Sequence, residues 1–319
     1  MNLSERYRPE VIDHYYAEES FIDSFKAVFE RQQDKRPKTY LFHGLSGTGK
    51  TTLARIAAKE FLKASDNDII EMNTANYRGI DAVRAMLQRV GLKPVAGSEA
   101  RVYILDECHQ MTKDAQNALL KALEDSANTQ TYFMLCTTEP GKLEKTIVNR
   151  AIQFETKPLS SELMGQLIFD IHVEYMHDVT ETDDSPTLPD AVIDAIVEKA
   201  EGSPRLALNI LDKVIDLPQE KMITAIDSFA QQEQYGIDLA KLLINGCKWS
   251  DVQKLLKELQ DDPESARRVV MGYANGVLVK STSAKIQARA FVVLDAFKDP
   301  FYNMGKPGLT YATYLALNS

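Results

Sequence analysis

The feature that most constrains this chain is the stretch from Thr39 to Thr52, which reads TYLFHGLSGTGKTT. It contains a glycine, four free positions and then Gly-Lys-Thr, which is the complete phosphate-loop pattern. A short apolar run that favours a strand precedes the glycines, and a run with helical periodicity follows them. Strand, glycine loop and helix start therefore come in the order that the motif requires. The sequence predicts a binding site for a nucleoside triphosphate.

The residue types of the loop predict separate roles. The ammonium of Lys50 can reach the terminal phosphates, and the hydroxyl of Thr51 can ligate Mg²⁺. The start of the following helix adds unpaired N–H donors and the positive end of its dipole. The other positions expected to surround the nucleotide, several of them glycines whose backbone N–H groups can turn toward phosphate oxygens, are Gly44, Ser46, Gly47, Thr48, Gly49 and Thr52.

Composition narrows the class of protein. The chain has 319 residues, 44% hydrophobic and 26% charged, which is ordinary for a globular protein of about two or three domains. No apolar run approaches the roughly 18 residues of a membrane span. The polar start MNLSERYRPE shows no secretory signal, so we expect a cytoplasmic protein with no membrane partner. A net charge of −9 argues against a generic basic nucleic-acid coat but leaves a local phosphate-binding surface open.

The cysteines give a further expectation. Cys108, Cys136 and Cys247 lie far apart and show no CxxC spacing. Neither a zinc site nor a disulfide framework is therefore indicated, and a reducing compartment fits best.

Strand and helix signals alternate through the first half of the chain. Strands are expected at 39–42, 68–73, 101–105 and 132–136, with a last short strand within 147–154, and helices at 20–32, after the phosphate loop, after residue 80 and at 110–124. This alternation predicts an α/β fold with a doubly wound, mainly parallel sheet.

Paired carboxylates follow the third expected strand. Four apolar residues end in Asp106 and Glu107, as expected of a buried parallel strand that delivers acids at its C-terminal edge. We expect Asp106 to hold Mg²⁺ through its water shell and Glu107 to orient and deprotonate the attacking water. An acidic pair that caps the following helix is the alternative reading. After the next strand, Thr137 and Thr138 place hydroxyls where one could hold the water or the γ-phosphate, although such a pair is also an ordinary turn signal.

Strand signals stop beyond residue 157. Helices are expected at 160–177, 190–200, 204–214, 221–232, 236–245, 249–259, 263–277, 282–297 and 310–317. The acidic stretch 178–189 reads as a connection, and Asp216-Leu217-Pro218 as a boundary. The expected division is a nucleotide-binding domain at 1–157, a small helical domain at 158–217 and an all-helical domain at 218–319.

With these motifs in place, residues 4 to about 217 resemble the clamp-loader ATPases of the AAA+ class, namely the bacterial gamma/tau subunit and the replication factor C small subunits. The resemblance adds roles to motifs that occur in family order. Tyr7-Arg8-Pro9 matches an element near the adenine base. Cys136 to Pro140 matches the first sensor, with the sensing side chain placed on Thr138. Gly202 to Arg205 matches the second sensor, from which Arg205 would touch the γ-phosphate from a helical lid.

The resemblance also implies assembly. Asn149-Arg150-Ala151 falls where the family usually carries Ser-Arg-Cys, so Arg150 would act in trans as the finger in a neighbouring subunit's site, although both flanking residues depart from the pattern. The family's zinc module is missing, so the chain looks more like a compact phage or archaeal-type subunit. Its C-terminal hundred residues match the family's oligomerising collar only in being helical. The implied cellular setting is the replisome of a bacterium or of a phage-infected cell.

The implied function is ATP-driven opening and placement of a sliding clamp on primer–template DNA, by a pentameric ring made with other clamp-loader subunits. ATP with Mg²⁺ would sit at each subunit boundary. The resemblance places Arg78 in an element that faces the central DNA chamber, and Arg84 and Lys113 are weaker candidates for the same surface.

Three other readings stay open on the sequence. A branch-migration motor of the same class would want a winged-helix domain at the C-terminus, where no paired strands are expected. A subunit that has lost turnover would not need Lys50, Glu107 and Arg205 together. A protein-remodelling ATPase would usually carry an aromatic pore loop, and Tyr77 stands at that position.

Overall fold

The computed structural model describes residues 2–74, 79–87, 90, 92–95, 98–125, 130–180, 187–258, 263–281, 283–301 and 304–318. The chain divides into two compact units, Met1–Gln219 and Glu220–Ser319. The three-domain division expected above stays a prediction. Among the described residues, no helix is both long enough and apolar enough to cross a membrane.

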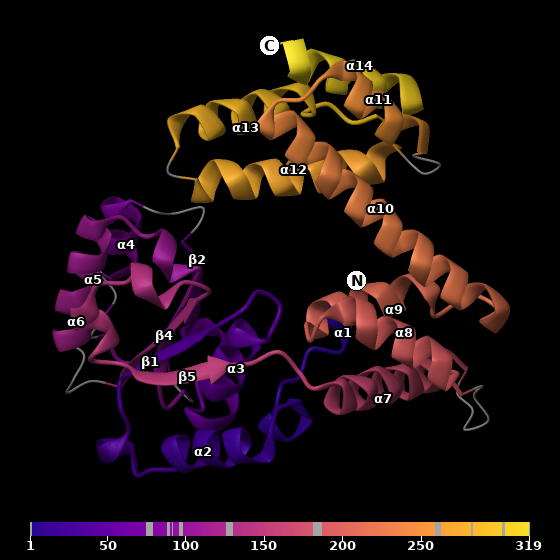
Figure 1. The fold of residues 1–319 in the computed structure, drawn as a ribbon. Coiled ribbons are helices and arrows are strands. Elements are labelled where there is room, and N and C mark those ends of the chain that lie inside the picture. Colours follow the sequence, from indigo (N-terminus) through magenta and orange to yellow (C-terminus); the bar gives the residue numbers. More distant parts are fainter. Residues whose placement is uncertain are drawn as a thin grey trace. The chain divides into compact units, whose positions relative to one another are not determined.

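A five-stranded sheet forms the centre of the first unit (Figure 1). Its strands, all paired in parallel, run in the order β2-β3-β4-β1-β5. Their bounds are β1 Thr39–Gly44, β2 Ile69–Asn73, β3 Arg101–Asp106, β4 Thr131–Thr137 and β5 Ile152–Thr156. Since β1 lies between β4 and β5, strands that are distant in sequence are neighbours in the sheet. The parallel pairing of all five strands confirms the expected parallel sheet.

Helices cover both faces of this sheet. On one face, α2 (Glu19–Phe29) and α3 (Lys50–Ile56) pack against alternate strand residues such as Phe42 and Ile104. On the other, α4 (Ile80–Leu87) and α5 (Lys113–Asp125) share a core with the intervening residues, such as Leu105. The central strands β1, β3 and β4 are buried on both faces, which explains their continuous apolar runs, whereas the edge strands β2 and β5 are partly exposed. With helices on both faces, the sheet is doubly wound.

The last strand begins later than the sequence pattern indicates. Lys145–Val148 form a short helix, α6, and β5 starts only at Ile152. Ile147 is fully buried in the core that also contains residues of α5. This apolar residue therefore belongs to a helix that packs against α5 and not to a strand. Arg150 lies between α6 and β5, outside regular structure.

The second half of the first unit is helical, as expected. Its helices are α7 (Ser161–Thr180), α8 (Asp190–Ala200) and α9 (Pro204–Val214), and each packs against the other two. Ser203 caps α9 by accepting a hydrogen bond from the N–H of Leu206, and Pro204 occupies the first helical position, where a missing N–H costs nothing. The short N-terminal helix α1 (Leu3–Arg6) packs against α9.

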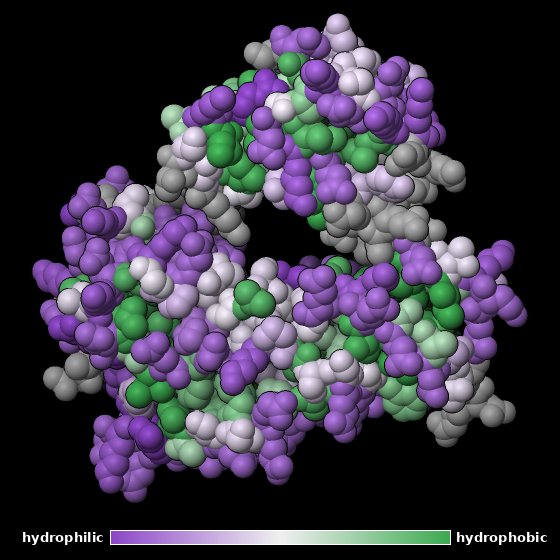
Figure 2. Space-filling view, viewed as in Figure 1, coloured by the Kyte–Doolittle hydropathy of each residue, from purple (hydrophilic) through white to green (hydrophobic). Residues whose placement is uncertain are grey.

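In the described part of the second unit, all regular structure is helical and no strand is present. The helices are α10 (Gln219–Asn245), α11 (Trp249–Glu258), α12 (Pro263–Lys280), α13 (Ala284–Ala296) and α14 (Gly305–Asn318). Figure 2 shows apolar residues interspersed with hydrophilic ones over the visible face of the chain.

Two sequence-based expectations about the second unit are wrong. The expected helices 221–232 and 236–245 are one helix, because Gly236 lies inside α10 and does not end it. A Cβ on Gly236 would lie 2.6 Å from Cβ of Val269, so this glycine permits close packing of α10 on α12. The last helix starts at Gly305 instead of residue 310, since Pro307 is tolerated in a first turn.

Candidate functional site

The phosphate loop joins β1 to α3 and buries its lysine. Nζ of Lys50 donates hydrogen bonds to the carbonyl oxygens of Gly44 at 3.0 Å and Leu45 at 2.7 Å, and the residue is only 6% exposed. Burial lowers the pKa of the Lys50 ammonium, while the negative charge of Glu107 acts in the opposite direction. The loop therefore holds a buried cation against its own carbonyl oxygens, in the place where the motif predicts phosphate contacts.

Gly49 shows why this loop needs glycine. Its φ of +92° is in the left-handed region, and a Cβ there would lie 2.6 Å from the hydroxyl oxygen of Tyr15. That hydroxyl donates a 2.9 Å hydrogen bond to the carbonyl oxygen of Thr48. Tyr15 therefore braces the loop from the N-terminal segment, a role that no sequence motif indicates.

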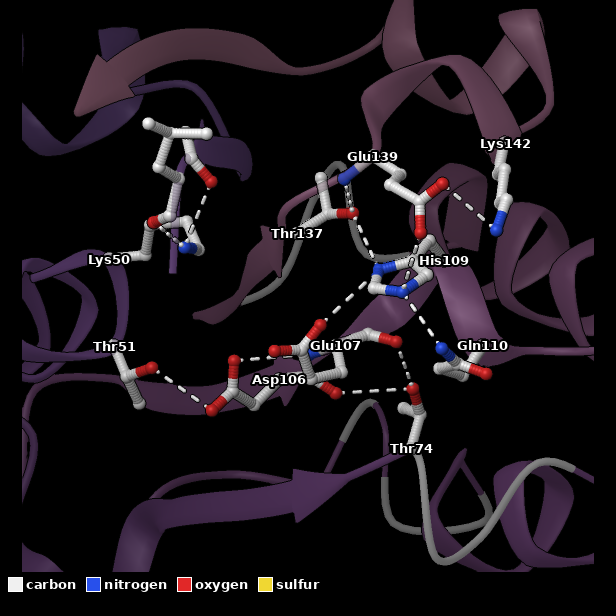
Figure 3. Close-up of polar contacts among 12 residues, drawn as sticks. Lys50, Thr51, Thr74, Asp106, Glu107, His109, Gln110, Thr137, Glu139 and Lys142 are labelled. Atoms are coloured by element: carbon white, nitrogen blue, oxygen red, sulfur yellow. Dashed lines mark hydrogen bonds and ion pairs between the residues drawn. The ribbon is translucent and has the colours of Figure 1, made fainter. Parts of the chain in front are cut away.

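The first residue pair of the expected metal site lies together at the C-terminal edge of the sheet. Oγ1 of Thr51 donates a 3.0 Å hydrogen bond to Oδ2 of Asp106, as Figure 3 shows. A hydroxyl and a carboxylate are hard oxygen donors, the type that Mg²⁺ takes alongside phosphate oxygens and water. Both residues therefore fit a magnesium ion that arrives with a nucleotide.

Glu107 follows Asp106 at a strained turn. Its φ of +52° is in the left-handed region, which is uncommon for a residue with a side chain. Thr74, directly after β2, fixes this turn by donating from Oγ1 to the carbonyl oxygens of Asp106 at 3.1 Å and Glu107 at 2.7 Å. The Glu107 side chain is one-third exposed. It makes no cap bond to the turn that follows it, Cys108–Gln110. At the start of α5, the N–H of Ala115 donates to Oγ1 of Thr112 at 3.3 Å, so the hydroxyl of Thr112 has the capping role that the alternative gives to the acidic pair.

A histidine that the sequence reading passed over lies beside Glu107. Nδ1 of His109 is 3.4 Å from Oε2 of Glu107 and 3.0 Å from Oγ1 of Thr137 (Figure 3). The order Asp-Glu-x-His was the available signal. Thr137 is fully buried at the end of β4, whereas Thr138, the expected sensor, is half-buried one residue beyond the strand.

The second expected sensor meets the loop from the helical part of this unit. A Cβ on Gly47 would lie 2.3 Å from Oγ of Ser203 and 3.4 Å from Cβ of Arg205. A cavity of about 90 Å³ opens beside this contact. The expected nucleotide-binding residues that line it are Tyr7, Arg8, Pro9, Gly47, Thr48, Gly49, Thr52 and Arg205. The structure thus brings the expected adenine element, the loop and Arg205 to one cavity. Ser46 is exposed on the loop.

The expected finger arginine has a partner within the chain. Nη2 of Arg150 lies 2.7 Å from Oε1 of Glu124 on α5, and Nη1 donates to the carbonyl oxygen of Thr146 at 3.1 Å. Its side chain is 43% exposed. This arginine remains at the surface, which is compatible with the expected action in trans.

The expected DNA-binding residues are only partly placed. Arg78 lies outside the described residues, as does Tyr77. Arg84 on α4 and Lys113 at the start of α5 are both exposed, and the two helices pack against each other. The two described cations are therefore available to a partner, and their role stays a prediction.

Comparison with known proteins connects this site to a family. A family model described as DNA polymerase III, delta subunit, matches residues 59–160. The replication factor C small subunit of Haloarcula marismortui is 31% identical over 235 residues, covering 72% of this chain and 68% of that protein. The corresponding protein of Methanococcus maripaludis is 29% identical over 263 residues, covering 81% and 79%.

A bacterial relative matches over a smaller share of its length. The DNA polymerase III subunit tau/gamma of Haemophilus influenzae is 28% identical over 268 residues, which are 76% of this chain but 37% of that protein. Among solved structures, the Thermotoga maritima RuvB Holliday junction branch migration motor superposes with a TM-score of 0.57 at 20% identity, covering 74% of this chain and 79% of that one. Domain III of the replication initiation protein DnaA from the same organism gives 0.51 at 12% identity, covering 70% and 97%. At these identities the structural likeness shows the AAA+ fold alone.

Proposed function

This chain belongs to the clamp-loader family of AAA+ ATPases, to which the replication factor C small subunits belong, and on that premise we propose that it is the ATP-hydrolysing subunit of a sliding-clamp loader. The loader would open a clamp and place it on primer–template DNA. The observation that carries the proposal is the hydrogen bond between Thr51 and Asp106, which sets two oxygen donors beside the buried Lys50.

Within one subunit, each residue of the site would have a separate role in ATP hydrolysis. Lys50 would leave its carbonyl partners for the terminal phosphates, because phosphate oxygens carry full charge and a carbonyl oxygen does not. Thr51 and Asp106 would hold Mg²⁺, which supplies charge neutralisation on the phosphate oxygens. Glu107 would accept a proton from the attacking water. Thr138 and Arg205 would contact the γ-phosphate.

A neighbouring subunit would complete the site. Arg150 would exchange its ion pair with Glu124 for the charge that develops on the transferring phosphoryl group of the adjacent chain. Since that ion pair is exposed, breaking it costs at most about 1 kcal/mol. We therefore propose a pentameric ring with other clamp-loader subunits, with ATP at the subunit boundaries and DNA in the central space near Arg78, Arg84 and Lys113.

The test is ATPase activity with and without primed DNA and a clamp. The proposal expects stimulation only when DNA and clamp are present together, and no nucleotide binding by Lys50→Ala under any condition. Absence of stimulation by DNA would overturn the loader function. Stimulation by four-way junction DNA would favour a branch-migration motor, and stimulation by an unfolded protein would favour a remodelling ATPase. No turnover under any condition, with ATP still bound, would favour an assembly subunit.

A further inference from the structure

His109 lies next to the proposed water-activating carboxylate and is buried. It is the middle residue of the turn Cys108–Gln110, directly after the left-handed Glu107, and only 7% of it is exposed. A buried imidazole needs hydrogen-bond partners on both nitrogens, because an unpaired buried polar atom is costly. The partners of the two nitrogens differ in kind, and this difference indicates what the residue does.

Nδ1 faces the reaction side. It lies 3.0 Å from Oγ1 of Thr137 and 3.4 Å from Oε2 of Glu107. A carboxylate oxygen lies near each ring nitrogen, but the amide nitrogen of Gln110 can only donate and lies 2.9 Å from Nε2, so we assign the proton and the donor role to Nδ1. Thr137 also accepts the backbone N–H of Glu139 at 3.0 Å, which fixes its hydroxyl oxygen. The contact with Thr137 at the end of β4 therefore orients the ring so that Nδ1–H points toward Glu107.

Nε2 faces away from Glu107. The amide nitrogen of the Gln110 side chain lies 2.9 Å from Nε2 of His109, and Oε1 of Glu139 lies 3.5 Å from the same ring nitrogen. Glu139 is itself paired with Lys142 at 2.9 Å. Figure 3 shows these contacts on the side of the imidazole that points away from Lys50 and Thr51. The contacts of Nε2 therefore hold the imidazole in place while Nδ1 faces Glu107.

Among the described residues, His109 is the support of the Glu107 carboxylate. Within the described part of the chain, His109 supplies the only ion-pair or hydrogen-bond contact of this carboxylate. The 3.4 Å separation is longer than a normal N–H···O bond, so the contact guides the carboxylate without locking it. Catalytic hydrogen bonds are often long in the absence of substrate and shorten in the substrate complex.

We propose that His109 is a positioning residue, whose Nδ1–H orients the Glu107 carboxylate for accepting the proton of the attacking water. The inference rests on the proposed function, since it assumes that Glu107 activates water. It does not require His109 to touch the nucleotide. It predicts that loss of the Nδ1 donor lowers kcat and leaves the affinity for ATP nearly unchanged, because a misplaced base affects the chemical step alone.

Two isosteric substitutions separate the two ring nitrogens. The amide nitrogen of Asn can replace Nδ1, whereas that of Gln can replace Nε2. In ATPase assays of the full-length chain with DNA and clamp, we expect His109→Ala and His109→Gln to lower kcat by about ten- to hundredfold. The KM for ATP should change less than about twofold. His109→Asn should recover most of the lost rate. Equal losses in Asn and Gln variants, or a loss of fluorescent-nucleotide binding that parallels kcat, would show a packing role and overturn the inference.

Glu107→Gln distinguishes this inference from the function on which it rests. If Glu107→Gln binds ATP and stalls while His109→Gln turns over like the unmodified protein, the inference fails and the proposed function stands. If Glu107→Gln turns over normally, the water-activating role itself is wrong. The double variant gives a further check: His109→Gln should have almost no effect in the Glu107→Gln background, because it acts through that carboxylate. Independent, multiplicative losses would contradict the inference.

Discussion

Oγ1 of Thr51, at the start of α3, donates a 3.0 Å hydrogen bond to Oδ2 of Asp106 at the end of β3, although 55 positions of sequence separate the two residues. The contact exists because β1 and β3 are parallel strands of one sheet, so both loops leave at the same edge. It sets two oxygen donors side by side, as the proposed Mg²⁺ site requires.

Thr51 provides the first prediction. Thr51→Val keeps the shape of the side chain but removes the hydroxyl, so one proposed ligand of Mg²⁺ is lost. We expect kcat/KM for Mg-ATP to fall by about a hundredfold or more, the scale seen when one charge-stabilising donor is removed. Thr51→Ser keeps the hydroxyl and is the matched control, expected to stay within about fivefold of the unmodified protein. Similar activity of the two variants would remove Thr51 from the metal site.

Arg150 provides the second. Arg150→Ala should bind ATP like the unmodified chain but lose about a thousandfold or more of turnover in the assembled ring, the scale reported for finger arginines. Mixing Arg150→Ala with Lys50→Ala subunits tests action in trans, because some boundaries then combine an intact loop with an intact finger. Activity should reappear in the mixture. No recovery on mixing, or impaired ATP binding by the isolated variant, would contradict the assignment.

Glu264 provides a prediction about pH. Hydrogen bonds from Arg267 lower the pKa of the Glu264 carboxyl to about 2, against burial, and the backbone N–H of Phe301 also donates to it. In the unfolded chain the pKa is about 4.3. A lowered folded-state pKa means that the stabilisation is complete above that value and is lost as the pH falls from about 4.3 to about 2.

Glu264→Gln should therefore destabilise the chain by roughly 2–4 kcal/mol near neutral pH, since it leaves the guanidinium of Arg267, whose side chain is only 11% exposed, without its charge partner. The denaturant midpoint measured from pH 7 to pH 2 checks this, because the gap between variant and unmodified protein should close toward pH 2. Asp295→Asn, which breaks the exposed pair with Lys298, is the control and should leave the denaturant midpoint nearly unchanged. A gap that stayed constant with pH would contradict the ionic origin.

Gly236 provides a prediction about packing. Gly236→Ala places a methyl group 2.6 Å from Cβ of Val269, and we expect a loss of about 1–3 kcal/mol from overpacking. Gly272→Ala is the matched control. It also lies inside a helix, α12, but its Cβ would meet nothing within 4 Å, so it should gain about 0.5–1 kcal/mol. Thermal unfolding of both variants is the measurement, and a stabilising Gly236→Ala would refute the close approach of α10 and α12.

Local pattern predicted much of the fold. Apolar runs located the central strands β1, β3 and β4 to within a few residues, because strands buried on both faces carry an unbroken signal. The edge strand β5 is partly exposed, and its start was located less well. The pattern failed at residues whose place in a helix or strand depends on contacts with other elements. Ile147 falls in the range expected for the last strand, but it lies in the short helix α6 and is buried against α5. Gly236 likewise reads as the start of a new helix, whereas it lies inside α10 beside Val269.

The sequence by itself determined the phosphate loop, the carboxylates after β3 and the order of the elements that carry them, since each depends on residue types a few positions apart. Only the tertiary structure decided what surrounds them. Tyr15 braces the loop from 33 positions away, and His109 meets Thr137 across 28. Such contacts depend on how strands and helices pack, and no local spacing encodes them. The orientation of Glu107 therefore depends on the tertiary structure and cannot be read from local sequence spacing.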